Sequence, residues 1–150
     1  MNTRLFFQRI EPAEDECRVA ALAVDQFMRQ IRADPTPLRR HRLTGADVAN
    51  CQRNLESTYI VRLFAELEAA LRTFWKHVKK PSDWPRIHVR ALIANVAARQ
   101  LVSPETLARA NEVRQCRNRL VHERPTGPVL TLGECRSHLC RFLSFLPHLW

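Results

Sequence analysis

The feature that most constrains the fold is a long run of apolar residues at helical spacing in the middle of the chain. The run holds Leu55, Tyr59, Leu63, Phe64, Leu67, Ala70, Leu71, Phe74 and Val78. Before it, Thr44 and Asp47 have the spacing of a capping box, with Asp in the place of Glu. The pattern predicts one long helix over about residues 45–79 that forms the main core element.

Four further segments have the periodicity of amphipathic helices and no segment has the alternation of a strand. They cover about residues 12–33, 86–100, 104–122 and 132–146. The prolines fall between them, and only 3 glycines occur in 150 residues. We therefore expect a single all-α domain over residues 1–150, a bundle of four or five helices joined mainly by short loops.

Local signals support two of these helix starts and predict one loop. Ser103, Pro104 and Glu105 form a strong start, because Ser caps the first turn and Pro is tolerated there. Thr131 and Glu134 form a complete capping box. The segment 35–43 is predicted to be a basic loop that contains Arg39, Arg40, His41 and Arg42. The first ten residues give no clear pattern.

The positive charge of the chain is concentrated in its second half. The net charge is +9; residues 1–75 hold 11 Lys and Arg against 10 Asp and Glu, whereas residues 76–150 hold 13 against 5. Such a charge favours a polyanionic partner, with a nucleic acid ahead of a membrane, because no segment combines a basic face with a long apolar one. The alternatives are charge that serves solubility and charge that matches an acidic protein.

The five cysteines are odd in number and form no Cys-x-x-Cys pair. Without a secretory signal or a membrane-length apolar stretch, this indicates free thiols in a reducing cytoplasm and no membrane association. Cys135, His138 and Cys140 lack a usual zinc spacing and an evident fourth ligand. We expect no metal and no cofactor.

The segment 114–123 carries the chemistry that stands out most. Arg117, Asn118 and His122 place a guanidinium, an amide and an imidazole within little more than one helical turn. Arginine binds phosphate as a permanent planar cation, and histidine exchanges protons near neutral pH. Asparagine can orient either group. These are the groups that phosphodiester cleavage without a metal requires.

The helical register places Arg117 in an unusual position. Leu107, Ala110, Val113, Leu120 and Val121 form one apolar arc, and Arg117 falls near its middle. Asn111, Arg114, Asn118 and His122 follow the neighbouring edge, where Asn118 and His122 can meet. The alternative is structural: Arg117 lies over apolar surface and pairs with a carboxylate, while His122 contacts the last carbonyls of its helix.

This motif resembles that of the HEPN domains, which are all-α modules with Arg, a polar residue that is often Asn, a short spacer and His near the end of a core helix. Arg117-Asn118-x-x-x-His122 fits the motif, and the loop and capped last helix that follow also fit. The resemblance covers about residues 44–148. Outside the motif it is a pattern of helices.

The resemblance implies a homodimer in which two motif helices form a composite cleft, and in many members a metal-independent endoribonuclease. Arg117 would contact the scissile phosphate, His122 would transfer protons, and Asn118 would position one of them. Arg114, Arg119 and Arg124 are secondary candidates for RNA contacts. One branch carries a modified tyrosine at the position of Arg124, so control by that modification is not expected here.

Three functions follow from these observations. The first is a ribonuclease of the toxin or antiviral-defence kind, with an antitoxin or another protein as a possible partner. The second is a non-catalytic module that binds RNA or nucleotides, and the third is a helical interaction protein with an acidic partner. Nothing in the chain identifies an RNA sequence, because specific recognition of RNA uses pockets and stacking surfaces that the sequence does not reveal.

Overall fold

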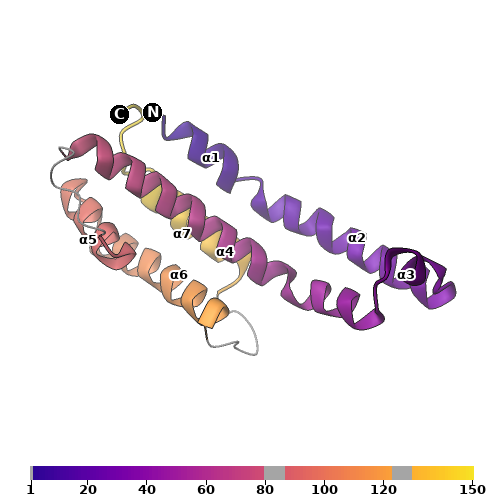
Figure 1. Cartoon of the computed structure of the whole chain (residues 1–150). Helices are drawn as coiled ribbons and strands as arrows, with labels where there is room; N and C mark the ends of the chain where they lie inside the picture. The colour runs from indigo at the N-terminus through magenta and orange to yellow at the C-terminus, as the bar shows by residue number, and fades with distance from the viewer. Residues whose placement is uncertain (1, 80–86, 123–129) are drawn as a thin grey trace.

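The computed structural model describes residues 2–79, 87–122 and 130–150, and these residues form an α-helical structure. An isolated bridge between Asn2 and Leu149 accompanies the helices. In chain order the helices are α1 (Arg4–Ile10), α2 (Ala13–Ala33), α3 (Thr36–His41), α4 (Gly45–Val78), α5 (Val89–Arg99), α6 (Pro104–His122) and α7 (Leu132–Leu143) (Figure 1). The all-α prediction is confirmed.

The long central helix α4 forms as the sequence predicts. Thr44 accepts a hydrogen bond from the backbone N–H of Asp47 at 3.2 Å, and the Asp47 carboxylate accepts one from the backbone N–H of Thr44 at 2.8 Å. This reciprocal box satisfies two backbone donors that the first turn leaves unpaired. The C-terminal half of α4 buries Ile60, Leu63, Phe64, Leu67, Ala70, Leu71 and Phe74.

The core lies around this buried half of α4. Helices α1, α5, α6 and α7 all pack against it, and α6 also packs against α7 and α5. From α7 the core receives Leu132, Cys135, Leu139, Phe142 and Leu143. Burial of this apolar surface is the main term that stabilises the bundle.

The two ends of the described chain meet beside α4. The Trp150 ring stacks on Phe6 with centroids 6.4 Å apart and meets Phe74 edge-on at 5.5 Å. The hydroxyl of Thr3 donates a hydrogen bond to the carbonyl of Pro147. These contacts order the short helix α1, for which the sequence gives no clear pattern, because a seven-residue helix has little stability of its own.

Helices α2 and α3 and the first half of α4 form an arm that extends beyond the other helices (Figure 1). Within the segment 14–59, all of which the structure describes, Val48 is the only residue that is buried. The predicted basic loop over residues 35–43 is wrong, because residues 36–41 form α3. Pro35 and Pro37 stand at the N-cap and in the first turn of α3, where a proline is tolerated.

The remaining helix predictions agree with the structure to within three residues at the ends that can be compared. The last helix ends at Leu143 instead of residue 146, although Leu146 is still buried. The predicted turn at Pro81 to Pro85 and the loop with Pro125 and Pro128 lie outside the described residues. The described ranges contain seven helices where four or five are expected, because α1 and α3 are added.

None of the described helices is both long enough and apolar enough to cross a lipid bilayer.

Candidate functional site

Helix α6 carries the motif residues, and its start is the one that the sequence predicts. The hydroxyl oxygen of Ser103 accepts a hydrogen bond from the backbone N–H of Thr106 at 3.3 Å and donates one to the Thr106 hydroxyl at 2.9 Å. Glu105 places a negative charge in the first turn, which suits the positive end of the helix. The last residue of α6 is His122; the expected stops, Pro125 and Gly127, are outside the described residues.

The buried face of α6 leads directly to Arg117. Ala110 and Val113 are fully buried, and Arg117 follows them by seven and four residues, which places it on the same side of the helix. Arg117 itself is only half-buried. The predicted apolar arc is correct at Ala110 and Val113 but wrong at Val121, whose exposed fraction is 43%. Arg117 therefore lies where the buried face of α6 opens to the surface.

The Arg117 guanidinium contacts an amide and no described carboxylate. Its Nη1 donates a hydrogen bond to Oδ1 of Asn118 at 3.2 Å. Among the described residues no Asp or Glu lies within ion-pair distance of Arg117. The alternative in which a carboxylate holds Arg117 thus has no support from this part of the chain.

Two further arginines of the same helix lack carboxylate partners in the described structure. Nε of Arg114 donates a hydrogen bond to Oδ1 of Asn111 at 3.3 Å, and Arg119 is half-buried without an ion pair to a described residue. Arg109, one turn before, differs: it pairs with Glu112 at 3.0 Å. Among the described residues, the arginine of the first half of α6 therefore has a carboxylate partner and those of its second half have none.

His122 is exposed at the end of α6. In the described ranges no hydrogen bond joins it to Asn118 or to another residue, so the expected meeting of Asn118 and His122 is not observed. Arg124 lies outside the described residues. The structure thus brings Arg117 and Asn118 together, and Arg114 and Asn111, but joins His122 to none of the described residues by a hydrogen bond.

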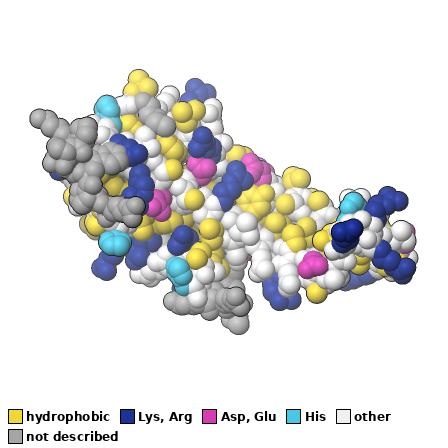
Figure 2. Space-filling view, in the orientation of Figure 1, with side chains coloured by type: hydrophobic (Ala, Val, Ile, Leu, Met, Phe, Trp, Pro, Cys, Tyr) yellow, Lys and Arg dark blue, Asp and Glu magenta, His cyan; other side chains and the backbone are white. Residues whose placement is uncertain are grey.

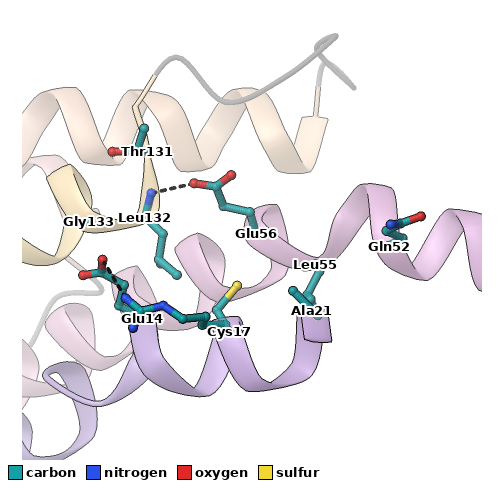
Figure 3. Close-up of a pocket in the computed structure, with 10 residues that line it drawn as sticks. Glu14, Cys17, Ala21, Gln52, Leu55, Glu56, Thr131, Leu132 and Gly133 are labelled. Atoms are coloured by element: carbon teal, nitrogen blue, oxygen red, sulfur yellow. Dashed lines mark hydrogen bonds and ion pairs between the residues drawn. The ribbon is translucent and has the colours of Figure 1, made fainter. Parts of the chain in front are cut away.

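A pocket of about 400 Å³ opens elsewhere, between α2, α4 and the start of α7 (Figure 3). No residue of α6 lines it. The carboxylate of Glu56 accepts a hydrogen bond from the backbone N–H of Leu132 at 2.8 Å, and Glu14 pairs with Arg136 at 3.0 Å. Both carboxylates therefore connect helices to one another. We interpret the pocket as a gap between packed helices.

Cys116, which precedes Arg117, has a buried thiol that contacts the thiol of Cys135. All five cysteines are free, and Cys116 of α6 and Cys135 of α7 are both buried. Burial, and then the neighbouring Cys116 thiol, raise the pKa of Cys135 to about 12. Sequence reasoning missed this pair; its only signal is that each cysteine falls on the apolar stripe of its helix. The described residues include no group of three His, Cys, Asp or Glu side chains arranged to hold a metal ion.

Comparison with protein-family models, with curated proteins and with solved structures finds no match to this chain.

Proposed function

We propose that the protein is a metal-independent endoribonuclease of the HEPN type, with a site formed by two copies of α6 in a homodimer. The observation that carries the proposal is the position of Arg117. It is half-buried on the core-facing side of α6 and lacks a described carboxylate partner. Desolvating a cation without a counter-charge costs free energy, and an incoming phosphate would supply that counter-charge.

The register of α6 favours a site made from two copies. Arg117 and His122 are five residues apart, which separates them by roughly 140° around the helix and about 7.5 Å along it. One helix therefore presents the two side chains in different directions. A second α6 related by two-fold symmetry can set the histidine of one copy near the arginine of the other.

The chemistry follows from the residue types. His122 removes the proton of a ribose 2′-hydroxyl, whose oxygen attacks the adjacent phosphorus while the bond to the 5′ oxygen breaks. The departing oxygen takes up a proton from water or from the second His122 of the dimer. Arg117 stabilises the charge that develops on the phosphate, and Asn118 holds the guanidinium in place. The products are a 2′,3′-cyclic phosphate and a 5′-hydroxyl end.

The decisive experiment is cleavage of a labelled RNA by the purified protein in the presence of EDTA. Arg117→Ala and His122→Ala should each lower the rate by roughly 10²-fold or more. Arg109→Ala is the matched control, since this arginine lies on the same helix but pairs with Glu112. Full activity in both motif variants, or activity that needs a divalent ion, would contradict the proposal.

A second candidate function is RNA binding without catalysis. It is favoured by the exposed position of His122, which no described residue orients. In that case the protein would bind RNA with strong salt dependence and would leave no cyclic-phosphate ends. End-group analysis of the RNA after incubation separates the two functions.

The biological setting that we propose is a toxin or a defence nuclease that acts in the cytoplasm, with an antitoxin or another protein as partner. Induced expression should then arrest growth in the wild type but not in the His122→Ala variant. Equal growth arrest by both would assign the toxicity to another property of the chain.

A further inference from the structure

We propose that the tip of the arm is a second RNA-binding surface. It binds the phosphate backbone at a place separate from the Arg117–His122 motif. The arm tip is defined here as the arginines at the end of α2 and around α3: Arg29, Arg32, Arg39, Arg40 and Arg42. All five are exposed. Figure 2 shows Lys and Arg side chains gathered at the end of the molecule where Figure 1 places α3.

The arm tip differs from the bundle in how its charges are balanced. Outside the arm tip, Arg9 pairs with Glu66 at 3.2 Å and Arg72 with Glu68 at 2.6 Å, and Arg62 pairs with Glu16 of α2. No arginine of the arm tip forms an ion pair with a described residue. Positive charge at the tip is therefore available to an external anion.

The nearby carboxylates are already engaged by the fold. Between residues 29 and 42 the only carboxylate is Asp34, against five arginines. Asp34 accepts a hydrogen bond from the backbone N–H of Thr36 at 2.9 Å, and the contact with Thr36, aided by the charge of Arg39, lowers its pKa. Farther along the arm, Asp25 accepts a hydrogen bond from Gln52, and Asp47 caps α4. The local surplus of positive charge is thus maintained.

The backbone holds three of these arginines within one compact turn. Arg42 adopts a left-handed conformation with φ of 54°, and its N–H bonds back to the carbonyls of Leu38 and Arg39. The N–H of Leu43 also bonds to the carbonyl of Leu38, at 2.9 Å. This closure of α3 keeps Arg39, Arg40 and Arg42 close together, so that they can contact successive phosphates without ordering a flexible loop first.

The composition of the tip suits contact with the phosphate backbone of RNA. Residues 1–75 contain no lysine, so every cation of the arm is an arginine or a histidine. The planar guanidinium donates paired hydrogen bonds that match phosphate oxygens. This inference rests on the proposed function only in taking RNA as the ligand; it does not need the protein to cleave it.

The test is a binding measurement in a protein that cannot cleave. In the His122→Ala background, fluorescence anisotropy with a labelled single-stranded RNA is recorded over a series of salt concentrations. The triple change Arg39→Ala, Arg40→Ala and Arg42→Ala should weaken binding at least ten-fold at low salt. A plot of the logarithm of the association constant against the logarithm of the salt concentration has a negative slope. Its steepness should decrease by about 2, because each lost phosphate contact removes about 0.7.

The matched control removes the same charge from the bundle by changing Arg9, Arg62 and Arg72 to Ala. Its affinity should stay within about three-fold of the parent, because these arginines are already neutralised by carboxylates. Replacement of Arg39, Arg40 and Arg42 by lysine should preserve most of the salt dependence of RNA binding, since the positive charge remains. Circular dichroism checks that each variant keeps its helical content.

Equal affinity of the tip variant and the control would overturn the inference. So would a poly-glutamate peptide that binds through the tip while RNA binding is unaffected, since the surface would then belong to an acidic protein partner. The proposed ribonuclease activity is read separately, by cleavage with His122 intact. Loss of RNA binding in the tip variant supports the inference even if the parent protein leaves RNA uncut.

Discussion

Arg117 donates a hydrogen bond from Nη1 to Oδ1 of Asn118, its neighbour in the chain, over 3.2 Å. Adjacent residues of a helix point about 100° apart, so this contact draws the guanidinium from the core-facing side of α6 toward its polar edge. A neutral amide orients the arginine without cancelling its charge. Arg117 thereby remains able to bind a phosphate.

The first prediction concerns this contact. Asn118→Asp would turn the amide into a carboxylate that pairs with Arg117 and competes with phosphate. We expect RNA cleavage to fall by roughly 10- to 100-fold. The affinity for RNA should fall as well, which separates this variant from one that only affects proton transfer. Asn118→Gln, which keeps an amide, is the control; activity in Asn118→Asp equal to the parent would show that the contact has no role.

The second prediction concerns the core between α4 and α7. Leu139 is fully buried, so Leu139→Ala should lower the free energy of unfolding by about 2–5 kcal/mol. Leu22→Ala is the comparison: Leu22 is 62% exposed on the arm, and its loss should change the stability by less than about 0.5 kcal/mol. Urea denaturation of both variants measures the difference. Similar values would mean that Leu22 is covered in solution, for example by a second copy.

The third prediction is a dependence of stability on pH at the helix caps. Hydrogen bonds from the backbone N–H and then the hydroxyl of Thr131 lower the pKa of Glu134, because they favour its charged form. The Glu134 carboxylate is therefore protonated less readily in the folded state than in the unfolded state. The contribution is present above the unfolded pKa of a glutamate, about 4.3, and is lost as the pH falls through the folded value.

Thermal unfolding at a series of pH values tests this linkage. Glu134→Gln should flatten the fall in Tm below about pH 5, because the variant has no proton to gain at that site. The capping box of Thr44 and Asp47 contributes in the same direction, since its hydrogen bonds lower the pKa of Asp47. If the Tm of Glu134→Gln falls below pH 5 as steeply as that of the parent, the Glu134 cap does not contribute to acid unfolding.

The fourth prediction separates the thiols by reactivity. Cys51 is exposed, whereas Cys135 is buried and its pKa is raised to about 12, so almost none of it is thiolate near neutral pH. In the native protein an alkylating reagent should modify Cys51 within minutes and Cys135 only after unfolding. Peptide mass analysis after timed alkylation gives the order. Rapid native modification of Cys135 would mean that α6 and α7 separate readily.

Much of the helical layout follows from local signals in the sequence. The capping boxes at Thr44 and Thr131 and the cap at Ser103 mark the starts of α4, α7 and α6, because a cap acts on hydrogen bonds of its own first turn. The region 35–43 is the exception. Its two prolines suggest a loop, yet a proline in a first turn lacks only a donor that the helix would not use.

The sequence alone determines the all-α class, the main helix boundaries and the presence of Arg117, Asn118 and His122 on one helix. These depend on spacing and on contacts between near neighbours. Tertiary packing decides the rest. It orders α1 against Trp150, buries Cys116 against Cys135, and leaves the arginines in the second half of α6 and those of the arm tip without described carboxylate partners. Which charges meet depends on how helices distant in sequence lie in space, and helical periodicity does not specify that arrangement.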